Sequence, residues 1–104
     1  MTTLSTHVLD TGLGAPADGM QVHLSRHGEA GWDRISAAAT DGDGRVDDFG
    51  RLEPGVYRLV FETGDYGNVF YPSVEVVFVV DTDRAHLHVP LLLGPFGYTT
   101  YRGS

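Results

Sequence analysis

The sequence predicts an all-β sandwich, and three observations support this fold class. Short apolar or alternating segments recur along the 104 residues, 14 glycines punctuate them, and helical periodicity is scarce. About eight short strands separated by turns are typical of a sandwich of two sheets. There is no internal repeat, linker or low-complexity stretch, so we expect residues 1–104 to form one domain with one core.

Three strands are expected in the first half of the chain. Each is a short segment bounded by stretches rich in Gly, Asp and Pro. Residues 35–39 would favour a helix on propensity alone, but the run is short and lies between turns, so we predict a strand. The expected strands are residues 4–9, 20–26 and 32–40, with turns over residues 10–19 and 27–31.

The second half predicts a tight turn, further strands and one short helix. The most regular strand, residues 56–62, is followed by an expected helical turn or short helix over residues 63–68. Residues 73–80 are almost continuously β-branched or aromatic and predict another strand. Turns are expected at residues 41–44, 53–55 and 81–83, a short segment at residues 45–49, and a terminal pair of strands from residue 86 onward.

The strand that begins at His86 has two unlike faces. Alternation puts His86, His88 and Pro90 on one face. Because proline lacks an N–H, we expect an edge, a bulge or an irregular ladder at Pro90. Leu92 adds an apolar group to the histidine face, which suggests a surface covered by another subunit. The opposite face is apolar and predicts core: Leu87, Val89, Leu91 and Leu93.

Composition excludes several classes of protein. The net charge of −7 argues against general binding to nucleic acid or to a membrane surface, since both require a basic face. No cysteine is present, so disulfides and thiol chemistry are absent, and all seven basic residues are arginine. No apolar run approaches the roughly 20 residues of a membrane span, and the N-terminus lacks the pattern of a signal peptide. We therefore expect a cytoplasmic protein.

Two motifs resemble parts of metal-binding sites, and both are incomplete. His86 and His88 have the H-x-H spacing of some metal enzymes, but none of the other histidines has ligand spacing. Residues 41–45 begin like a calcium loop, yet Arg45 and Val46 stand where an oxygen ligand and a glycine are needed. We expect no metal and no other cofactor, and a turn whose carboxylates accept backbone N–H groups.

The five histidines differ in their expected surroundings. His23 and His27 lie on the polar side of a strand and in a loop, so we expect them to be solvated, and His86 to be exposed. His7 and His88 lie mid-strand among apolar neighbours, where a neutral imidazole is either satisfied structurally or used in chemistry. The pattern alone leaves both roles open. No Gly-x-Ser-x-Gly elbow indicates a serine nucleophile.

Several segments in a fixed order carry a family resemblance. The sharpest is the terminal tetrapeptide Tyr101-Arg-Gly-Ser104. The others are Leu4-Ser-Thr-His-Val-Leu-Asp-Thr11, Gly14-Ala-Pro-Ala17, Thr40-Asp-Gly-Asp-Gly-Arg45, Gly55-Val-Tyr-Arg-Leu59, Phe61-Glu-Thr-Gly64, Tyr71-Pro72, His88-Val-Pro-Leu-Leu-Leu93 and Pro95. Over almost its whole length the chain resembles the 5-hydroxyisourate hydrolases, transthyretin-like enzymes of purine degradation.

The resemblance implies a fold, an assembly and a reaction. The fold is a transthyretin-like sandwich of two four-stranded sheets, with one short helix after the fifth strand. The assembly is a homotetramer whose active sites lie at the dimer–dimer interface. The reaction is hydrolysis of a cyclic C–N bond of 5-hydroxyisourate, giving 2-oxo-4-hydroxy-4-carboxy-5-ureidoimidazoline. An imidazole that activates water at neutral pH would need no cofactor for this.

The resemblance also implies the site residues. His7, Arg45 and His88 match the catalytic positions, with the histidines as base and proton donor and Arg45 binding the substrate and stabilising negative charge. His7, Arg45, Tyr101 and Ser104 match substrate-binding positions. Two departures from the family pattern are Gly94 in place of Ser and Tyr71 in place of the common Phe.

Two other functions remain to be weighed against the hydrolase. A transthyretin-like protein that carries an apolar ligand in a channel predicts apolar residues or Lys where His7, Arg45 and His88 stand. A purely structural sandwich module leaves the polar strand face and the terminal motif unexplained. The residues therefore favour the hydrolase.

Overall fold

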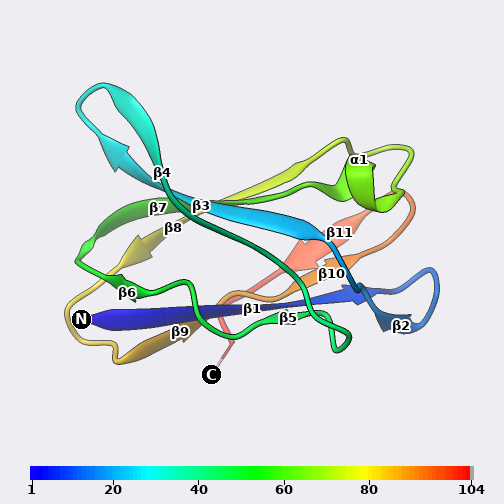
Figure 1. Ribbon diagram of the computed structural model, residues 1–104, viewed down its shortest axis with the longest axis horizontal. Coiled ribbons are helices and arrows are strands. Elements are labelled where there is room, and N and C mark those ends of the chain that lie inside the picture. Colours follow the sequence, from blue (N-terminus) through cyan, green and yellow to red (C-terminus); the bar gives the residue numbers. More distant parts are fainter. Residues whose placement is uncertain (104) are drawn as a thin grey trace.

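The computed structural model describes residues 1–103, which form two β-sheets packed face to face (Figure 1). The first sheet has four antiparallel strands in the order β4-β3-β7-β8. Residues 35–39 lie within β4, so the prediction of a strand there is confirmed. The bounds are β3 Gln21–Gly28, β4 Gly31–Ala39, β7 Gly55–Phe61 and β8 Val74–Val80.

The second sheet is built around β1, Thr2–Asp10. Along one side of β1 run the parallel strands β9 and β10, with β11 antiparallel to β10. Along the other side run three antiparallel pieces, β2, β5 and β6. The bounds are β2 Ala15–Pro16, β5 Arg45–Val46, β6 Arg51–Leu52, β9 His86–His88, β10 Leu91–Leu93 and β11 Tyr98–Thr100.

Interrupted strands explain why there are more segments than the eight expected. The pieces on each side of β1 follow one another along the same edge, so this sheet is four strands wide, and two four-stranded sheets are confirmed. β9 and β10 are separated at Pro90, whose missing N–H breaks the ladder as predicted. The short pairing of β2 with the end of β1 was not predicted, because Ala15 and Pro16 lie in a stretch that reads as turn.

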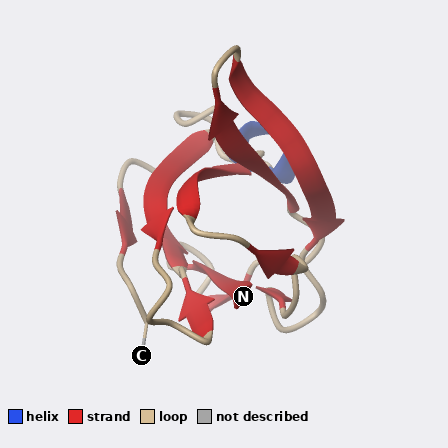
Figure 2. Cartoon of the chain, turned by 90° about the vertical axis from the view of Figure 1, so that its left-hand side faces the viewer, coloured by secondary structure: helices blue, strands red, loops and turns tan. Residues whose placement is uncertain are grey.

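The expected short helix is present after β7. It is α1, Thr63–Tyr66, and it ends at Gly67, whose φ of 131° suits glycine. Nothing in residues 1–103 forms a helix with the length and hydrophobicity needed to cross a membrane. Figure 2 looks at the molecule from one end and shows the strands of the two sheets on opposite sides of a common interior.

The core receives side chains from both sheets. In β1, Leu4, Thr6 and Val8 are fully buried, and their neighbours Ser5 and His7 project from the opposite face of the sheet. The Thr6 hydroxyl donates to the carbonyl of Val89 at 2.5 Å, which satisfies a buried polar group beside the ladder break. The predicted core residues Leu87, Val89, Leu91 and Leu93 are all buried.

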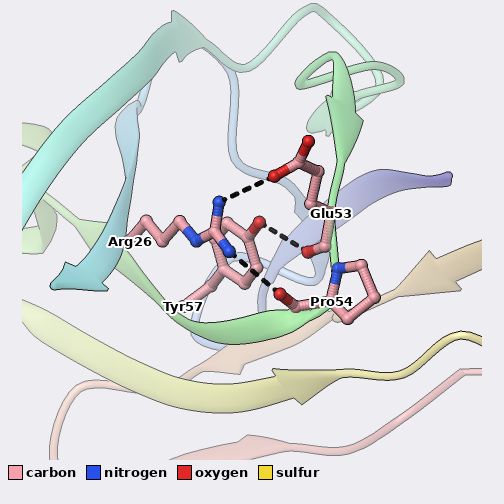
Figure 3. Close-up of polar contacts among 4 residues, drawn as sticks. All are labelled: Arg26, Glu53, Pro54 and Tyr57. Atoms are coloured by element: carbon pink, nitrogen blue, oxygen red, sulfur yellow. Dashed lines mark hydrogen bonds and ion pairs between the residues drawn. The ribbon is translucent and has the colours of Figure 1, made fainter.

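A polar cluster on the first sheet fixes the turn that precedes β7 (Figure 3). The Arg26 guanidinium donates to the carbonyl of Pro54 at 3.0 Å and to the Glu53 carboxylate at 3.3 Å. The Tyr57 hydroxyl donates to the Glu53 carbonyl at 2.7 Å, and Arg26 lies 5.6 Å from the centre of its ring. Burial raises the pKa of Tyr57, so the phenol stays protonated and keeps donating.

Candidate active site

A tight turn delivers Arg45 to the sheet beside His7. The Asp41 carboxylate accepts the backbone N–H groups of Asp43 at 2.9 Å and Arg45 at 3.0 Å, as predicted for this turn. Gly44 has a φ of 76°, and its carbonyl accepts the N–H of Val8 at 2.7 Å. A Cβ at this position would collide with the carbonyl oxygen of Val8, so only glycine lets the turn lie this close to β1.

The three residues predicted as catalytic meet on one face of the sheet. Arg45 on β5 is the registered partner of His7 on β1. On the other side of β1, His88 on β9 is the registered partner of Ser5, two residues before His7. Because side chains at alternate positions share a face, these groups project together from the side opposite the core. His7 and His88 are half-buried and Arg45 is exposed.

A row of hydroxyls and imidazoles continues from His88 along the same face. The Ser5 hydroxyl lies 2.8 Å from Nδ1 of His88 and 2.9 Å from Nε2 of His86. The Thr3 hydroxyl lies 2.5 Å from Nδ1 of His86. His86 is exposed, as expected, yet both of its ring nitrogens have partners. Sequence reasoning missed Ser5, although its place two residues from His7 was the available signal.

The segment after β11 returns to His88. The backbone N–H of Gly103 donates to the carbonyl of His88 at 2.8 Å. A Cβ built on Gly103 would lie 2.8 Å from Cδ2 of the His88 ring, so a glycine is needed where the backbone covers the imidazole. Ser104, predicted to bind substrate, lies outside the described residues.

Tyr101 lies away from the two histidines. Its side chain is 56% exposed, and the residue lines a groove with Val76, Val79 and Leu87. Leu87 is the residue of β9 that faces the core, opposite to His86 and His88. Within residues 1–103 no hydrogen bond joins Tyr101 to His7 or His88. A single chain therefore brings His7, Arg45 and His88 to one face of the sheet and leaves Tyr101 in a separate groove.

The electrostatic surroundings of His88 favour a neutral imidazole. Burial lowers the pKa of His88, and the nearby Arg45 guanidinium lowers it further, as do the neighbouring imidazoles of His7 and His86. A contact with the Ser5 backbone opposes this shift. A neutral imidazole keeps a lone pair that can take a proton from water, and the permanent charge of Arg45 can stabilise a developing oxyanion. The arrangement suits hydrolysis of an amide-like bond.

The remaining histidines lie on the other sheet. His27 is exposed, as predicted, and its ring lies edge-on to Trp32 with centroids 5.1 Å apart. The expectation that His23 is solvated is wrong: its side chain is 14% exposed and its Nε2 lies 3.5 Å from the Glu62 carboxylate. Across residues 1–103, no group of three or more His, Cys, Asp or Glu side chains is placed to hold a metal ion.

Comparison with protein families gives one match that spans nearly the whole chain. Residues 4–103 match the model of the HIUase/transthyretin family. The chain is 48% identical to a probable 5-hydroxyisourate hydrolase of Caenorhabditis elegans, covering 98% of this chain and 81% of that protein. It is 45% identical to the 5-hydroxyisourate hydrolase of Mus musculus, covering 97% and 94%. It is also 44% identical to the uric acid degradation bifunctional protein TTL of Arabidopsis thaliana, of which it spans 37%.

Solved structures with this fold include proteins of two functions. The 5-hydroxyisourate hydrolase of Klebsiella pneumoniae superposes with a TM-score of 0.90 at 37% identity, and the alignment covers 100% of both chains. Sea bream transthyretin in complex with thyroxine superposes with a TM-score of 0.89 at 31% identity, covering 96% of this chain and 93% of that chain. The fold is thus common to a 5-hydroxyisourate hydrolase and to a transthyretin solved with thyroxine bound, so function has to be argued from the chemistry of the site.

Proposed function

The chain belongs to the HIUase/transthyretin family, and on this premise we propose that it hydrolyses 5-hydroxyisourate, a reaction of urate degradation. Support comes from full-length similarity to hydrolases of that name at 45–48% identity and from the Klebsiella pneumoniae enzyme among solved structures. The product would be 2-oxo-4-hydroxy-4-carboxy-5-ureidoimidazoline. The observation that carries the proposal is the meeting of His7, Arg45 and His88 on one face of the second sheet.

In the proposed mechanism, the neutral imidazole of His88 takes a proton from water as the oxygen attacks a ring carbonyl. Arg45 binds the oxo edge of the substrate and stabilises the negative charge that develops on the attacked oxygen. The C–N bond then breaks, and His88 or His7 returns a proton to the leaving nitrogen. General acid–base catalysis of this kind contributes about 10²–10⁴-fold in rate, and positioning supplies more.

Tyr101 and Ser104 are proposed as substrate contacts of the same site. The support is their closeness in the sequence to Gly103, whose backbone lies against the His88 ring. The terminal motif would then close the site while β11 anchors it to the sheet.

We also propose that this single domain assembles into a homotetramer with the active sites at the dimer–dimer interface. Support comes from strands β8 and β11, which end their sheets and have an unpaired edge within residues 1–103 of one chain. Val77 and Val79 on β8 are 58% and 67% exposed, and Tyr98 on β11 is 43% exposed. Apolar edge strands of this kind are surfaces that a second copy would cover.

The test is the ultraviolet decay of freshly prepared 5-hydroxyisourate, with the uncatalysed decay subtracted. The protein should accelerate the decay, and His88→Ala should lower kcat/KM by about 10²–10⁴-fold while the sheet signal in circular dichroism is unchanged. An exposed histidine on the other sheet provides the control, since His27→Ala should retain activity. A folded protein that leaves the decay at the buffer rate would refute the hydrolase and favour the binding protein.

A further inference from the structure

We propose that Ser5 and His86 form a proton relay that carries the proton taken up by His88 away from the substrate. The proposal deepens the hydrolase function above and rests on it for its catalytic consequence. Ser5 and His86 are positioning residues in this account, because they act on the substrate only through His88. The relay is a physical property of the folded chain and can be measured without substrate.

The relay exists because β1 and β9 run parallel and in register. Thr3 is paired with His86, and Ser5 with His88, so four polar side chains form two rungs on the outer face. The His86 ring spans the gap between the rungs, with Nδ1 2.5 Å from the Thr3 hydroxyl and Nε2 2.9 Å from the Ser5 hydroxyl. Ser5 then reaches Nδ1 of His88 at 2.8 Å. These distances make a continuous hydrogen-bonded path.

Ser5 couples the two rings because it has one proton to share between two nitrogens. The hydroxyl completes both contacts when it donates to one ring and accepts from the other. If it donates to Nε2 of His86, then His88 donates its Nδ1–H to Ser5, and Nε2 of His88 has a free lone pair. If it donates to Nδ1 of His88, then His86 donates its Nε2–H, and His88 carries its proton on Nε2. The two neutral rings therefore have the same tautomer in either state.

The first state is the base form of the site. Proton uptake gives the hydrogen-bond directions of the second state, with one additional proton that remains on Nδ1 of His86. When Nε2 of His88 takes a proton from water, its Nδ1–H moves to the Ser5 oxygen and the Ser5 proton moves to Nε2 of His86. His88 is then neutral with an Nε2–H, Ser5 is again a hydroxyl, and His86 is a cation with protons on both nitrogens. The reverse transfer lets His88 return the proton from Nε2 to the leaving nitrogen, so the protons balance over one cycle.

The charges around the two rings favour this direction of transfer. His88 is half-buried, and the positive charge of the nearby Arg45 guanidinium further disfavours an imidazolium at His88. His86 is exposed to solvent, where hydration stabilises an imidazolium, and its Nδ1 proton can be donated to Thr3. Moving the charge from His88 to His86 thus relieves the repulsion from Arg45 during the attack of water.

The first test is the tautomer of each histidine, measured by two-bond ¹⁵N–¹H correlation spectra of the ¹⁵N-labelled protein near pH 7.5. We expect His86 and His88 to share the Nδ1–H tautomer in the unmodified protein. In Ser5→Ala the two histidines should no longer share a tautomer, and His88 should shift toward the Nε2–H form. Ser5→Thr keeps a hydroxyl and should preserve the shared tautomer. His27, exposed on the other sheet, is the internal control and should not change in either variant.

The second test is kinetic and uses the same variants. Ser5→Ala and His86→Gln should each lower kcat about 10- to 100-fold with little change in KM, and Ser5→Thr should restore most of the loss. Circular dichroism and the His27 signals establish that each variant is folded.

Each outcome bears on the relay itself. Opposite tautomers of His86 and His88, or a Ser5→Ala variant with unchanged His88 tautomer and unchanged kcat, would overturn it. Because the spectra need no substrate, matched tautomers in a protein that does not hydrolyse 5-hydroxyisourate would reject the proposed function and leave the hydrogen-bonded path intact. Slow Ser5→Ala turnover with an unchanged His88 tautomer would also overturn the relay, since the defect would then have another cause.

Discussion

The backbone of Gly103 lies directly on the imidazole of His88. The Gly103 N–H donates to the His88 carbonyl at 2.8 Å. A Cβ built on Gly103 would lie 2.8 Å from Cδ2 of the His88 ring and 3.2 Å from the Cβ of His88. The close approach leaves no room for a methyl group, so one of the two residues would have to shift.

Gly103→Ala should therefore move the His88 ring and lower turnover at least tenfold, since small displacements of a catalytic group reduce rate steeply. The melting temperature should fall only slightly, because the segment lies at the sheet edge. Gly97→Ala is the matched control, since a Cβ there would have no heavy atom within 4 Å. Steady-state kinetics and thermal melts of both variants check this prediction, and equal kinetics for the two would contradict it.

The contact of Gly44 with Val8 should matter for stability as well as activity. Gly44→Ala places a methyl group against the Val8 carbonyl at a φ of 76°, a conformation that alone costs about 1–3 kcal/mol for most residues. Because the turn holds Arg45 beside His7, activity should fall too. Gly42→Ala in the same turn has open space around its Cβ and should change the free energy of unfolding by less than about 0.5 kcal/mol. Urea unfolding of both variants decides the matter.

The lowered pKa of His88 sets the acid limit of activity. Burial, followed by the charge of Arg45, lowers this pKa, so His88 stays neutral below the ordinary histidine value of about 6.5. The acid limb of kcat/KM should accordingly lie below pH 6.5. Arg45→Met removes a nearby positive charge and should raise the pKa of His88, which an NMR titration of the ring would show. A lower or unchanged His88 pKa in Arg45→Met would contradict this account.

Tyr66 should make stability sensitive to alkaline pH. Burial and the hydrogen bond from its hydroxyl to the Asp10 carboxylate, at 2.8 Å, raise the pKa of Tyr66 to about 12. The unfolded chain releases this proton near pH 10, so folding stability should be lost as pH rises from 10 toward 12. Tyr66→Phe should reduce this pH dependence, and Tyr98→Phe, on the exposed edge, should not. Urea unfolding at pH 9 and 11 measures the difference.

Local pattern was sufficient for most of the sandwich. Period-two alternation identified the buried face of the strand from His86 to Leu93, and the missing N–H of Pro90 located an irregularity in the ladder. The turn before Arg45 followed from carboxylate and glycine chemistry. The pairing of Ala15 and Pro16 with β1 was not predictable, because those residues have turn-like composition and are ordered by the neighbouring strand.

The site could be predicted only in part, because its geometry is not local. Resemblance named His7, Arg45 and His88, and the fold brings them to one face. The link from Ser5 to the histidines depends on the parallel register of two strands 83 residues apart, which no spacing within either strand reveals. The exposure of His23 was wrongly predicted for the same reason, since its imidazole lies against the carboxylate of Glu62 from a neighbouring segment.

The parallel pairing of β1 with β9 also determines when the site can form. During synthesis, a chain emerging at about 5–20 residues per second exposes β1 several seconds before β9 exists. The hairpins of the other sheet have partners close in sequence and can form in that interval, whereas Ser5 can pair with His88 only after β9, 83 residues later, has been synthesised. Because non-local strand pairing is slow, catalytic competence should be acquired after these hairpins have formed, and a ribosome-bound chain lacking β9 would be folded in part and inactive.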